Sequence, residues 1–562
     1  MHEFGPCRCM STMHAASMLA AIRSVAVLGV DAYDITVEVD AAKGLPQWTI
    51  VGLAAGAVKE AKERVAAALA NSGFHLPPRR YTINLAPADQ RKDGTAFDLP
   101  IALGVLVATG QLDAESVEGL VALGELGLDG ALRPVRGVLP VAMHLARAKA
   151  TAGTESPLLI VAPGNRNEAR LVSRILCAAP PTLAALVSAL RSWPGGREEA
   201  LAPTRLRDAM EQFAHSGEGA IGATGTSAVR ETAADEILDL SDVVGQESAK
   251  RALEIAAAGG HAVLMVGPPG GGKTMLARRL PTILPPLNED EALEVMAVQS
   301  VAGLLRSALT IDVLQRPFRA PHHTLSVAAL IGGGSMPRPG EVSLAHHGVL
   351  FLDELQEMPR SVLDALRQPM EDGRVLISRA QQSLGFPAKF ALVGAMNPCP
   401  CGYAGHPTRP CTCTSADVGR HRARVSGPLA DRIDITIQVP AVSIALLGGA
   451  PLSESSAEVR ARVVRARERQ GERFRRLRRV TCNAHVSGPW LVAHSVISPE
   501  ARALLAISAD RLGLSARAYH RVLKVARTIA DLDGATNIER AHVAESLFVR
   551  APDNLPVREV VV

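Results

Sequence analysis

The chain has 562 residues, 47% hydrophobic and 21% charged, a composition that is typical of folded globular domains and excludes an intrinsically disordered chain. The length predicts about three or four domains, and a formal net charge of +4 is too small to indicate a nucleic-acid-binding protein by itself. No apolar run is long enough to span a membrane, and residues 1–19 lack the basic start and apolar core of a signal peptide. We therefore expect a cytoplasmic protein with a disordered N-terminus at residues 1–19 and no membrane partner.

Residues 20–195 combine strand and helix patterns and are expected to form one α+β domain. Residues 34–40 and 80–87 alternate apolar and polar side chains, as strands with one buried face do. Residues 54–73 have helical spacing that ends at a glycine, and residues 96–110 are apolar enough to form a buried helix.

The next regions differ in character. Residues 196–237 are rich in small polar residues and are predicted to form a linker. Helix and apolar strand patterns then alternate through residues 238–445, which predicts an α/β core with a parallel sheet. Residues 446–562 have mostly helical patterns and are expected to form a helical C-terminal domain.

The core begins with a nucleotide-binding motif. The apolar residues 261–266 are followed by GPPGGGKT and then by a helical pattern, which is the context that distinguishes a phosphate-binding loop (P-loop) from a flexible Gly/Pro turn. Glycines let backbone N–H groups surround phosphate oxygens, and the helix N-terminus adds a partial positive charge. The lysine reaches the β- and γ-phosphates, and the threonine hydroxyl binds Mg²⁺. We predict that ATP and Mg²⁺ bind at Gly267, Pro268, Pro269, Gly270, Gly271, Gly272, Lys273 and Thr274.

Two acidic residues follow the apolar strand pattern of residues 349–352. Alone, such a pair usually marks a strand that meets solvent. Beside a P-loop, Asp353 at the end of a neighbouring strand would help Thr274 to hold Mg²⁺, and Glu354 would polarise the attacking water.

Three further polar residues are candidates for the same site. A third strand pattern ends in Asn397, whose amide would orient the water near the γ-phosphate; the alternative is a strand-end turn before Pro398. Arg432 and Arg517 carry the planar group that binds phosphate oxygens in pairs, although most arginines lie on the surface without such a role.

Six segments together resemble the YifB/ComM family of AAA+ ATPases, which are related to the motor subunit of magnesium chelatase. They are GPPGGGKT, RPFRAPHHTLSVAALIGGG, PGEVSLAHHGVLFLDEL, GAMNPCPCG, SGPLADRIDI and LSARAYHRVLKVARTIADL. The resemblance runs from residue 20 to residue 550 with a gap at the linker, and residues 317–354 are its most specific part.

The resemblance implies roles for the site residues. Asn397 takes the sensor-1 position, Arg432 is the arginine finger that reaches the nucleotide of the next subunit, and Arg517 takes the sensor-2 position in a helical lid. A finger from a neighbour implies a homo-oligomeric ring, and relatives form hexamers. The family likeness further implies an ATP-driven motor on single-stranded or branched DNA, a branch-migration helicase in homologous recombination during DNA uptake. The alternative is a magnesium-chelatase-like motor that remodels a protein partner or drives metal insertion.

The N-terminal domain resembles the Lon protease fold without its nucleophile. The Ser of that fold corresponds to Ala96 and its Lys partner to Leu139, so a Ser–Lys pair is missing unless the adjacent Thr95 supplies the hydroxyl. We expect an inactive domain that docks a partner or contacts DNA, and an ATP-dependent protease is the weakest interpretation.

Two basic regions are candidates for DNA contact. The segment QRPFRAPHHTLS lies where related motors line the ring pore, and its candidate residues are Arg316, Arg319, His322 and His323. Packing and turn chemistry around its prolines is the alternative. A second group of arginines recurs every three or four residues, which places them on one face of a helix: Arg462, Arg465, Arg469, Arg473 and Arg476. This face is either a phosphate-binding stripe or a solvated helix face with Glu pairs.

Four cysteines are clustered in the segment CPCGYAGHPTRPCTC: Cys399, Cys401, Cys411 and Cys413. Four thiolates can bind Zn²⁺ tetrahedrally, although the C-x-C spacing is tighter than that of most zinc sites. The alternative is a cysteine-rich surface loop or a set of redox-sensitive thiols. A position just after Asn397 favours a structural role over a catalytic one.

Overall fold

The computed structural model describes residues 19–53, 55–90, 92–152, 157–191, 238–305, 314–334, 337–378, 383–406, 408–425, 429–441, 454–477 and 480–550. The predicted disordered N-terminus, apart from Leu19, and the predicted linker lie outside these residues. The chain divides into two compact units, the first with the described residues up to 191 and the second with those from 238 onward, except that Gln299–Leu305 cluster with the first.

The first unit is built on a seven-stranded mixed sheet with the strand order β3-β4-β2-β1-β5-β8-β9. The pairs β1–β2 and β2–β4 are antiparallel and the others are parallel. Its strands are β1 (Leu19–Leu28), β2 (Asp31–Ala42), β3 (Gln47–Val51), β4 (Arg80–Ala86), β5 (Leu120–Ala122), β8 (Leu158–Ile160) and β9 (Leu176–Ala178); β6 (Glu125–Leu126) and β7 (Leu132–Arg133) form a separate ribbon.

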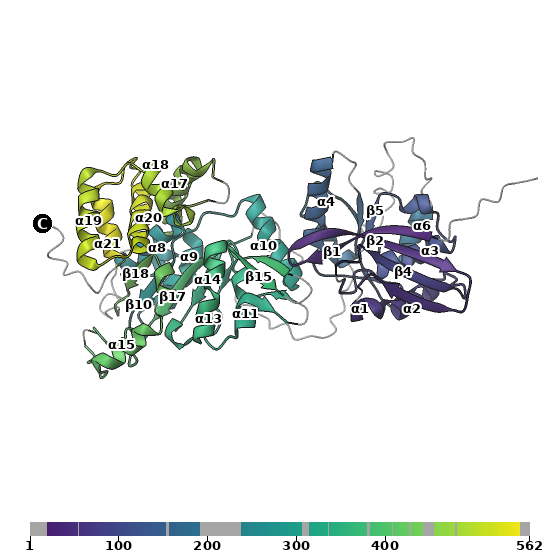
Figure 1. Ribbon diagram of the computed structural model, residues 1–562, viewed down its shortest axis with the longest axis horizontal. Coiled ribbons are helices and arrows are strands. Elements are labelled where there is room, and N and C mark those ends of the chain that lie inside the picture. Colours follow the sequence, from purple (N-terminus) through teal and green to yellow (C-terminus); the bar gives the residue numbers. More distant parts are fainter. Residues whose placement is uncertain are drawn as a thin grey trace, which may run out of the picture. The chain divides into compact units, whose positions relative to one another are not determined.

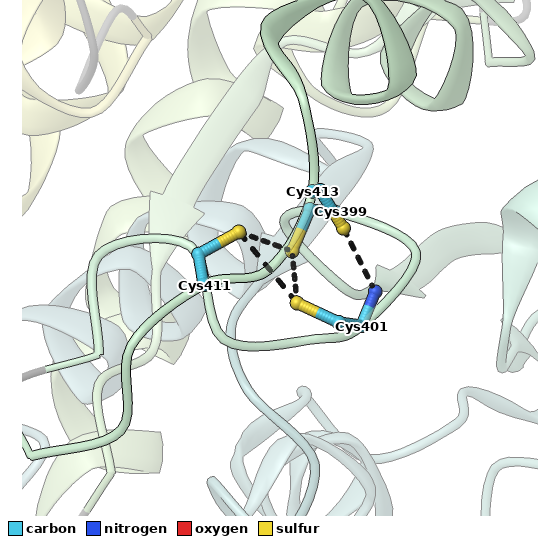
Figure 2. A group of neighbouring side chains, drawn as sticks. All are labelled: Cys399, Cys401, Cys411 and Cys413. Carbon is cyan, nitrogen blue, oxygen red and sulfur yellow. Dashed lines mark hydrogen bonds between the residues drawn. The ribbon is translucent and has the colours of Figure 1, made fainter.

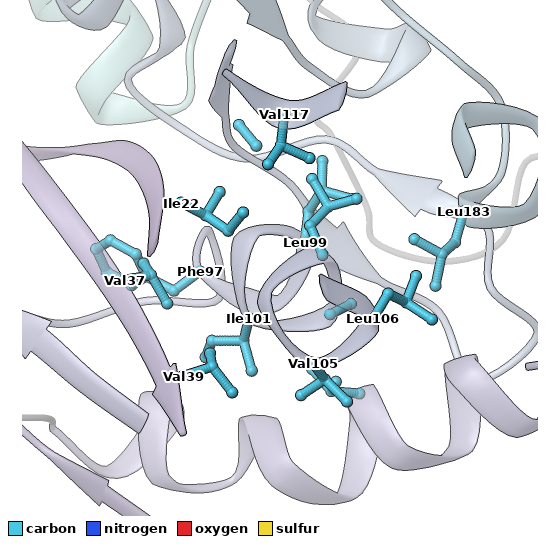
Figure 3. Close-up of a cluster of buried hydrophobic side chains, with 14 of the residues drawn as sticks. Ile22, Val37, Val39, Phe97, Leu99, Ile101, Val105, Leu106, Val117 and Leu183 are labelled. Carbon is cyan, nitrogen blue, oxygen red and sulfur yellow. The ribbon is translucent and has the colours of Figure 1, made fainter. Parts of the chain in front are cut away.

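Helix α3 (Asp98–Ala108) is the centre of this unit, because it is buried on almost every face. Figure 3 shows its residues Leu99, Ile101, Val105 and Leu106 among side chains of β1 and β2. The other helices are α1 (Gly56–Lys59), α2 (Ala61–Asn71), α4 (Val138–Ala152), α5 (Arg166–Arg170) and α6 (Leu183–Arg191). The predicted strands at 34–40 and 80–87 and the buried helix at 96–110 are therefore confirmed, while the helix predicted at 54–73 is divided at Glu60.

The second unit contains a five-stranded, all-parallel sheet with the order β11-β14-β17-β10-β18. Figure 1 labels three neighbouring strands of this sheet, β17, β10 and β18. These strands are β10 (Val263–Val266), β11 (Phe318–Arg319), β14 (Val349–Leu352), β17 (Ala391–Met396) and β18 (Ile435–Gln438). Strands β10 and β14 are buried along their whole length, as expected for a parallel sheet that is covered on both faces. The predicted parallel α/β core is confirmed.

Helices and short ribbons complete the core of this unit. The helices are α8 (Glu247–Gly259), α9 (Lys273–Ile283), α10 (Glu289–Ala302), α11 (Val327–Ile331), α12 (Glu341–Leu344), α13 (Arg360–Ala365), α14 (Arg367–Asp372) and α15 (Ser415–Ala423). The ribbons pair β12 (Gly332–Gly333) with β13 (Arg338–Pro339) and β15 (Arg374–Ser378) with β16 (Ser383–Pro387).

The C-terminal part of the second unit is helical, as predicted, with α17 (Ser456–Phe474), α18 (Gly488–His494), α19 (Pro499–Leu512), α20 (Ala516–Leu532) and α21 (Arg540–Phe548). Ser455 begins α17 with a capping box that includes Glu458. Helix α17 packs on α8 of the core: Arg467 donates to the carbonyl of Ala257 at 2.9 Å, and Gln470 donates to that of Ala258 at 3.0 Å. These side chains supply donors to carbonyls at the end of α8 that have no partner within the helix.

None of the helices in the described part of the chain has the length and apolarity needed to cross a membrane.

Candidate nucleotide-binding site

The P-loop connects the buried strand β10 to helix α9, as the sequence pattern predicts. Gly267 stands where the loop leaves the strand, and a Cβ atom there would collide with the carbonyl oxygen of Val439. Gln246, which belongs to none of the sequence motifs, also supports the loop. Its side-chain amide donates to the carbonyls of Gly271 at 3.2 Å and Pro440 at 2.6 Å. No signal in the sequence singled out this glutamine, because its contacts depend on the fold.

Lys273 is buried at the centre of the site. Its ammonium group donates to the carbonyls of Gly267 at 2.7 Å and Pro268 at 3.0 Å, and to Oδ1 of Asn397 at 3.2 Å. Burial lowers the pKa of this lysine, although the charges of Asp353 and Glu354 oppose that shift. A phosphate would therefore replace these carbonyls as the partner of the ammonium group.

Asp353 and Thr274 meet beside this lysine. The Thr274 hydroxyl donates to Oδ2 of Asp353 at 2.9 Å, and the backbone N–H of Glu354 donates to Oδ1 of Asp353 at 2.9 Å. A hydroxyl and a carboxylate side by side are the hard oxygen ligands that Mg²⁺ prefers. The donor set therefore fits a magnesium ion.

The sheet order explains how Asn397 reaches the site. Strand β17 lies between β10, which leads into the P-loop, and β14, which ends at Asp353. The sequence-based expectation that the Asp353 strand directly neighbours the P-loop strand is therefore wrong, because β17 intervenes. Asn397 follows β17, and its amide meets Lys273 from that middle position.

Glu354 has a partner that sequence reasoning did not assign. Its carboxylate forms an ion pair with Nδ1 of His323 at 3.1 Å, and its backbone is left-handed with a φ of 48°. Positive φ is uncommon for a residue other than glycine and often occurs at functional sites. His323 lies a few residues after β11, and the pairing of β11 with β14 brings the two residues together.

The two candidate arginines are near a common cluster of charge. Arg432 pairs with Glu371 at the end of α14. Arg517 is exposed near the start of α20 and makes no hydrogen bond or ion pair with another residue in the described part of the chain. Burial lowers the pKa of Arg521, and the positive charges of Arg432 and Arg517 add to that effect against the opposing charge of Asp434. Arg521 also forms an ion pair with Asp434 at 3.5 Å, so this region holds carboxylates as well as guanidinium groups.

The candidate DNA-contact residues fall into two groups. Arg316 is mostly covered by a network that includes the carbonyl of His347 at 2.7 Å and Glu291 at 2.9 Å, which favours the packing alternative over contact with DNA. Arg319 forms a two-point pair with Glu341 at 2.7 and 2.8 Å, whereas His322 is exposed.

The arginine stripe of α17 is largely engaged within the protein. Arg462 pairs with Glu254 at 2.5 Å, Arg473 pairs with the buried Asp531, and Arg469 donates to the Asp531 carbonyl. Arg465 and Arg476 are exposed. Most of the stripe is therefore structural, which corrects its interpretation as one phosphate-binding face.

The four cysteines of the predicted cluster lie together, as Figure 2 shows. The sulfur of Cys399 is 3.3 Å from that of Cys401 and 3.6 Å from that of Cys411. The Cys413 sulfur accepts the Cys401 N–H at 3.4 Å, and all four sulfurs lie within 4.8 Å of one another.

The structure places the two residues that the sequence comparison with the Lon protease fold singles out, Ala96 and Leu139, without testing that comparison. Leu139 is fully buried and offers no amine, and Ala96 offers no hydroxyl. The adjacent Thr95 donates its hydroxyl proton to Glu125 at 2.5 Å.

A P-loop between a parallel strand and a helix, with a carboxylate at the end of β14 and an amide at the end of β17, defines a P-loop nucleotide-binding protein. The family described as magnesium chelatase, subunit ChlI, matches residues 239–447. Its relatives described as subunit ChlI of Mg-chelatase and as the ChlI C-terminal domain match residues 37–154 and 453–550. The chain belongs to the ComM/YifB family of magnesium-chelatase-like AAA+ proteins.

Individual relatives cover nearly the whole chain. The competence protein ComM of Haemophilus influenzae is 44% identical over 95% of this chain and 97% of its own length. The protein YifB of Salmonella typhimurium is 42% identical over 96% of this chain and 98% of its own. The magnesium-chelatase 38 kDa subunit of Rhodobacter capsulatus is 26% identical over 55% of this chain and 85% of its own.

Proposed function

We propose that this protein is an ATP-hydrolysing ring motor that acts on DNA and drives branch migration during the recombination of imported DNA. The assembled site at the ends of β10, β14 and β17 carries the ATPase part of this proposal. The near full-length similarity to a relative named as a competence protein supports the DNA part.

Each residue of the site has a separate role in ATP hydrolysis. Lys273 binds the β- and γ-phosphates, and backbone N–H groups of the P-loop surround their oxygens. Thr274 and Asp353 would hold Mg²⁺, which neutralises developing charge on the phosphates when it is bound. Glu354 accepts a proton from the attacking water, and Asn397 orients that water.

Arg432 and Arg517 complete the site in the proposed ring. Each would stabilise the negative charge that develops on the γ-phosphate, and Arg432 would do so on the neighbouring subunit's nucleotide. The exposure of Arg517, which makes no hydrogen bond or ion pair with another residue in the described part of the chain, supports this proposal, because its guanidinium group is available to bind phosphate oxygens.

The DNA-contact proposal now centres on fewer residues. The exposed His322, together with Arg319 and His323, remains the candidate contact in the segment after β11. Phosphate contacts of this kind are independent of sequence, which suits a motor that moves along a strand.

The first prediction concerns ATP hydrolysis. Single-stranded or forked DNA is expected to increase the ATPase rate several-fold, measured by phosphate release at low salt. Lys273→Ala should abolish nucleotide binding, whereas Glu354→Gln should keep binding and lower hydrolysis by about a hundredfold or more. Failure of every DNA to bind or to stimulate hydrolysis would reject the DNA motor while leaving the ATPase intact.

A magnesium-chelatase-like motor that remodels a protein partner or drives metal insertion is the second candidate. Matches to ChlI over three segments of the chain favour it. An ATPase rate that is indifferent to DNA but rises with a protein partner would support this candidate.

We also propose that the four-cysteine cluster holds a structural Zn²⁺ ion. Zinc–thiolate bonds of about 2.3 Å give a tetrahedron with sulfur–sulfur edges of about 3.8 Å, close to the separations seen in this cluster. Backbone N–H groups of Ala404 and Cys401 donate to the sulfurs of Cys399 and Cys413, as outer partners of metal thiolates do. The donor set therefore fits zinc.

A further inference from the structure

We infer that the cysteine cluster braces the nucleotide site, meaning that it fixes the positions of Asn397 and Pro269. Metal bound by these cysteines would then set the affinity of the P-loop for nucleotide. This inference rests on the proposed zinc and nucleotide sites. It adds a mechanical connection between them that runs through Gly402, Pro269 and the end of β17.

The first connection is along the chain. Cys399 is buried and lies two residues after Asn397, whose amide bonds Lys273. Any movement of Cys399 is therefore transmitted through Pro398 to the residue that touches the P-loop lysine.

The second connection closes a loop around Asn397. Cys411 and Cys413 lead into α15, and His421 of that helix hydrogen-bonds the backbone carbonyl of Asn397 at 3.0 Å through Nε2. The cluster joins the two ends of the segment 399–413, because the Cys401 N–H donates to the sulfur of Cys413. A metal that joins all four cysteines would hold Asn397 between two fixed points.

The third connection is a direct contact with the P-loop. A Cβ atom on Gly402 would lie 2.7 Å from Cδ and 2.9 Å from Cγ of Pro269, so the cysteine loop packs against the proline ring of the motif. Gly402 also has a φ of 83°, in the turn where its N–H donates to the Cys399 carbonyl at 2.9 Å. Only a residue without a side chain allows this approach.

These three contacts give the cluster a consequence for binding. Without the metal, the four sulfurs are free to separate, and both the Pro269 contact and the Asn397 position lose their support. An unbraced P-loop must become ordered when nucleotide binds, which lowers affinity.

The experiment compares zinc content with nucleotide affinity in the full chain. Zinc is measured by mass spectrometry after gel filtration, and affinity by titration with a fluorescent ATP analogue. The wild type should hold about one zinc per chain. Cys411→Ser should lose the zinc and weaken the analogue's binding by about tenfold. Cys177→Ser is the matched control, because this thiol lies in the first unit, where burial raises its pKa to about 12.

A second variant tests the contact between Gly402 and Pro269 without removing the metal. Gly402→Ala should keep the zinc but weaken nucleotide binding, because the added methyl group meets Pro269. Circular dichroism and thermal unfolding confirm that each variant is folded.

The outcomes distinguish three failures. A wild type with less than about 0.2 zinc per chain rejects the metal site. Zinc loss or Gly402→Ala without a change in affinity rejects the brace and leaves the zinc proposal standing. A wild type that binds no analogue, like Lys273→Ala, rejects the nucleotide site itself.

Discussion

At the scale of single residues, the side chains of the nucleotide site bond partners within the protein. A bound nucleotide and its attacking water must replace these partners. Lys273 bonds carbonyls of its own loop, and Glu354 bonds His323. The pair between His323 and Glu354 is partly exposed, so it contributes little to the stability of the fold. The pair matters for hydrolysis because it occupies the carboxylate that must meet the attacking water.

A second prediction follows from this pair. His323→Ala should raise the basal ATPase rate by about two- to fivefold. In this variant Glu354 can reach the attacking water without first breaking an ion pair that contributes roughly 1 kcal/mol. The unfolding temperature should change little. Steady-state phosphate release without DNA is the measurement. Thr324→Val is the control, since this hydroxyl contacts His322 and not Glu354. A fall in rate would instead show that His323 helps to position the glutamate.

At the scale of secondary-structure elements, the turn before β14 carries a buried imidazole. His346 accepts the Lys389 N–H at Nδ1 and bonds Glu294 at 3.0 Å through Nε2, so Nε2 holds the proton and is not free to bind a metal. Burial lowers the pKa of His346 to about 4, with the charge of His347 acting in the same direction and Glu294 opposing. Hydrogen bonds from the two histidines lower the pKa of Glu294.

The third prediction is a loss of stability in acid. Between pH 4 and the ordinary value near 6.5, the unfolded chain binds a proton at His346 that the folded chain does not, so stability falls as pH falls through this window. The lowered pKa of Glu294 adds a loss below its ordinary value of 4.5. Unfolding midpoints in urea measured from about pH 7 to about pH 5 should fall less steeply for His346→Gln than for the wild type. Equal slopes would contradict this assignment.

Contiguous motifs could be predicted from the sequence, but contacts between distant elements could not. The P-loop, the strand that ends at Asp353 and the cysteine cluster each lie within a short segment, so spacing alone indicates their chemistry. Arg316 looked available for DNA because its partners Pro285, Glu291 and His347 come from two other segments.

The same limit applies to the α17 arginines and to the sheet. Arg462 finds Glu254 more than two hundred residues earlier in the chain, so helical spacing could not show that it is paired. The sheet order depends on which strands pair, and chain order does not reveal that β17 lies between β10 and β14. The Lon-like character of the first unit stays a prediction.

At the scale of the whole molecule, the proposed ring makes each active site the product of two subunits. In one chain Arg432 pairs with Glu371, so ring assembly would exchange that carboxylate for a neighbour's phosphate. Head-to-tail interfaces of this kind close into a ring when the rotation from one subunit to the next divides a full turn evenly.

The fourth prediction tests shared sites by mixing. Arg432→Ala and Lys273→Ala should each be inactive alone. An equal mixture should recover activity at about a quarter of its interfaces, where an intact P-loop faces an intact finger. Arg420→Ala, whose side chain pairs with Asp417 on the surface, is the control and should stay active. Absence of recovery in verified mixed rings would argue that Arg432 acts within its own subunit.

The packing of α17 on α8 has a practical consequence for dividing this protein into fragments. A truncation near residue 445 would remove Arg462, Arg467 and Gln470 and so expose Glu254 and the end of α8 without their partners. It would also uncover the apolar residues that α8 and α17 bury together. An ATPase core expressed without its C-terminal helices should therefore aggregate, and the smallest soluble fragment should begin near residue 238 and include α21.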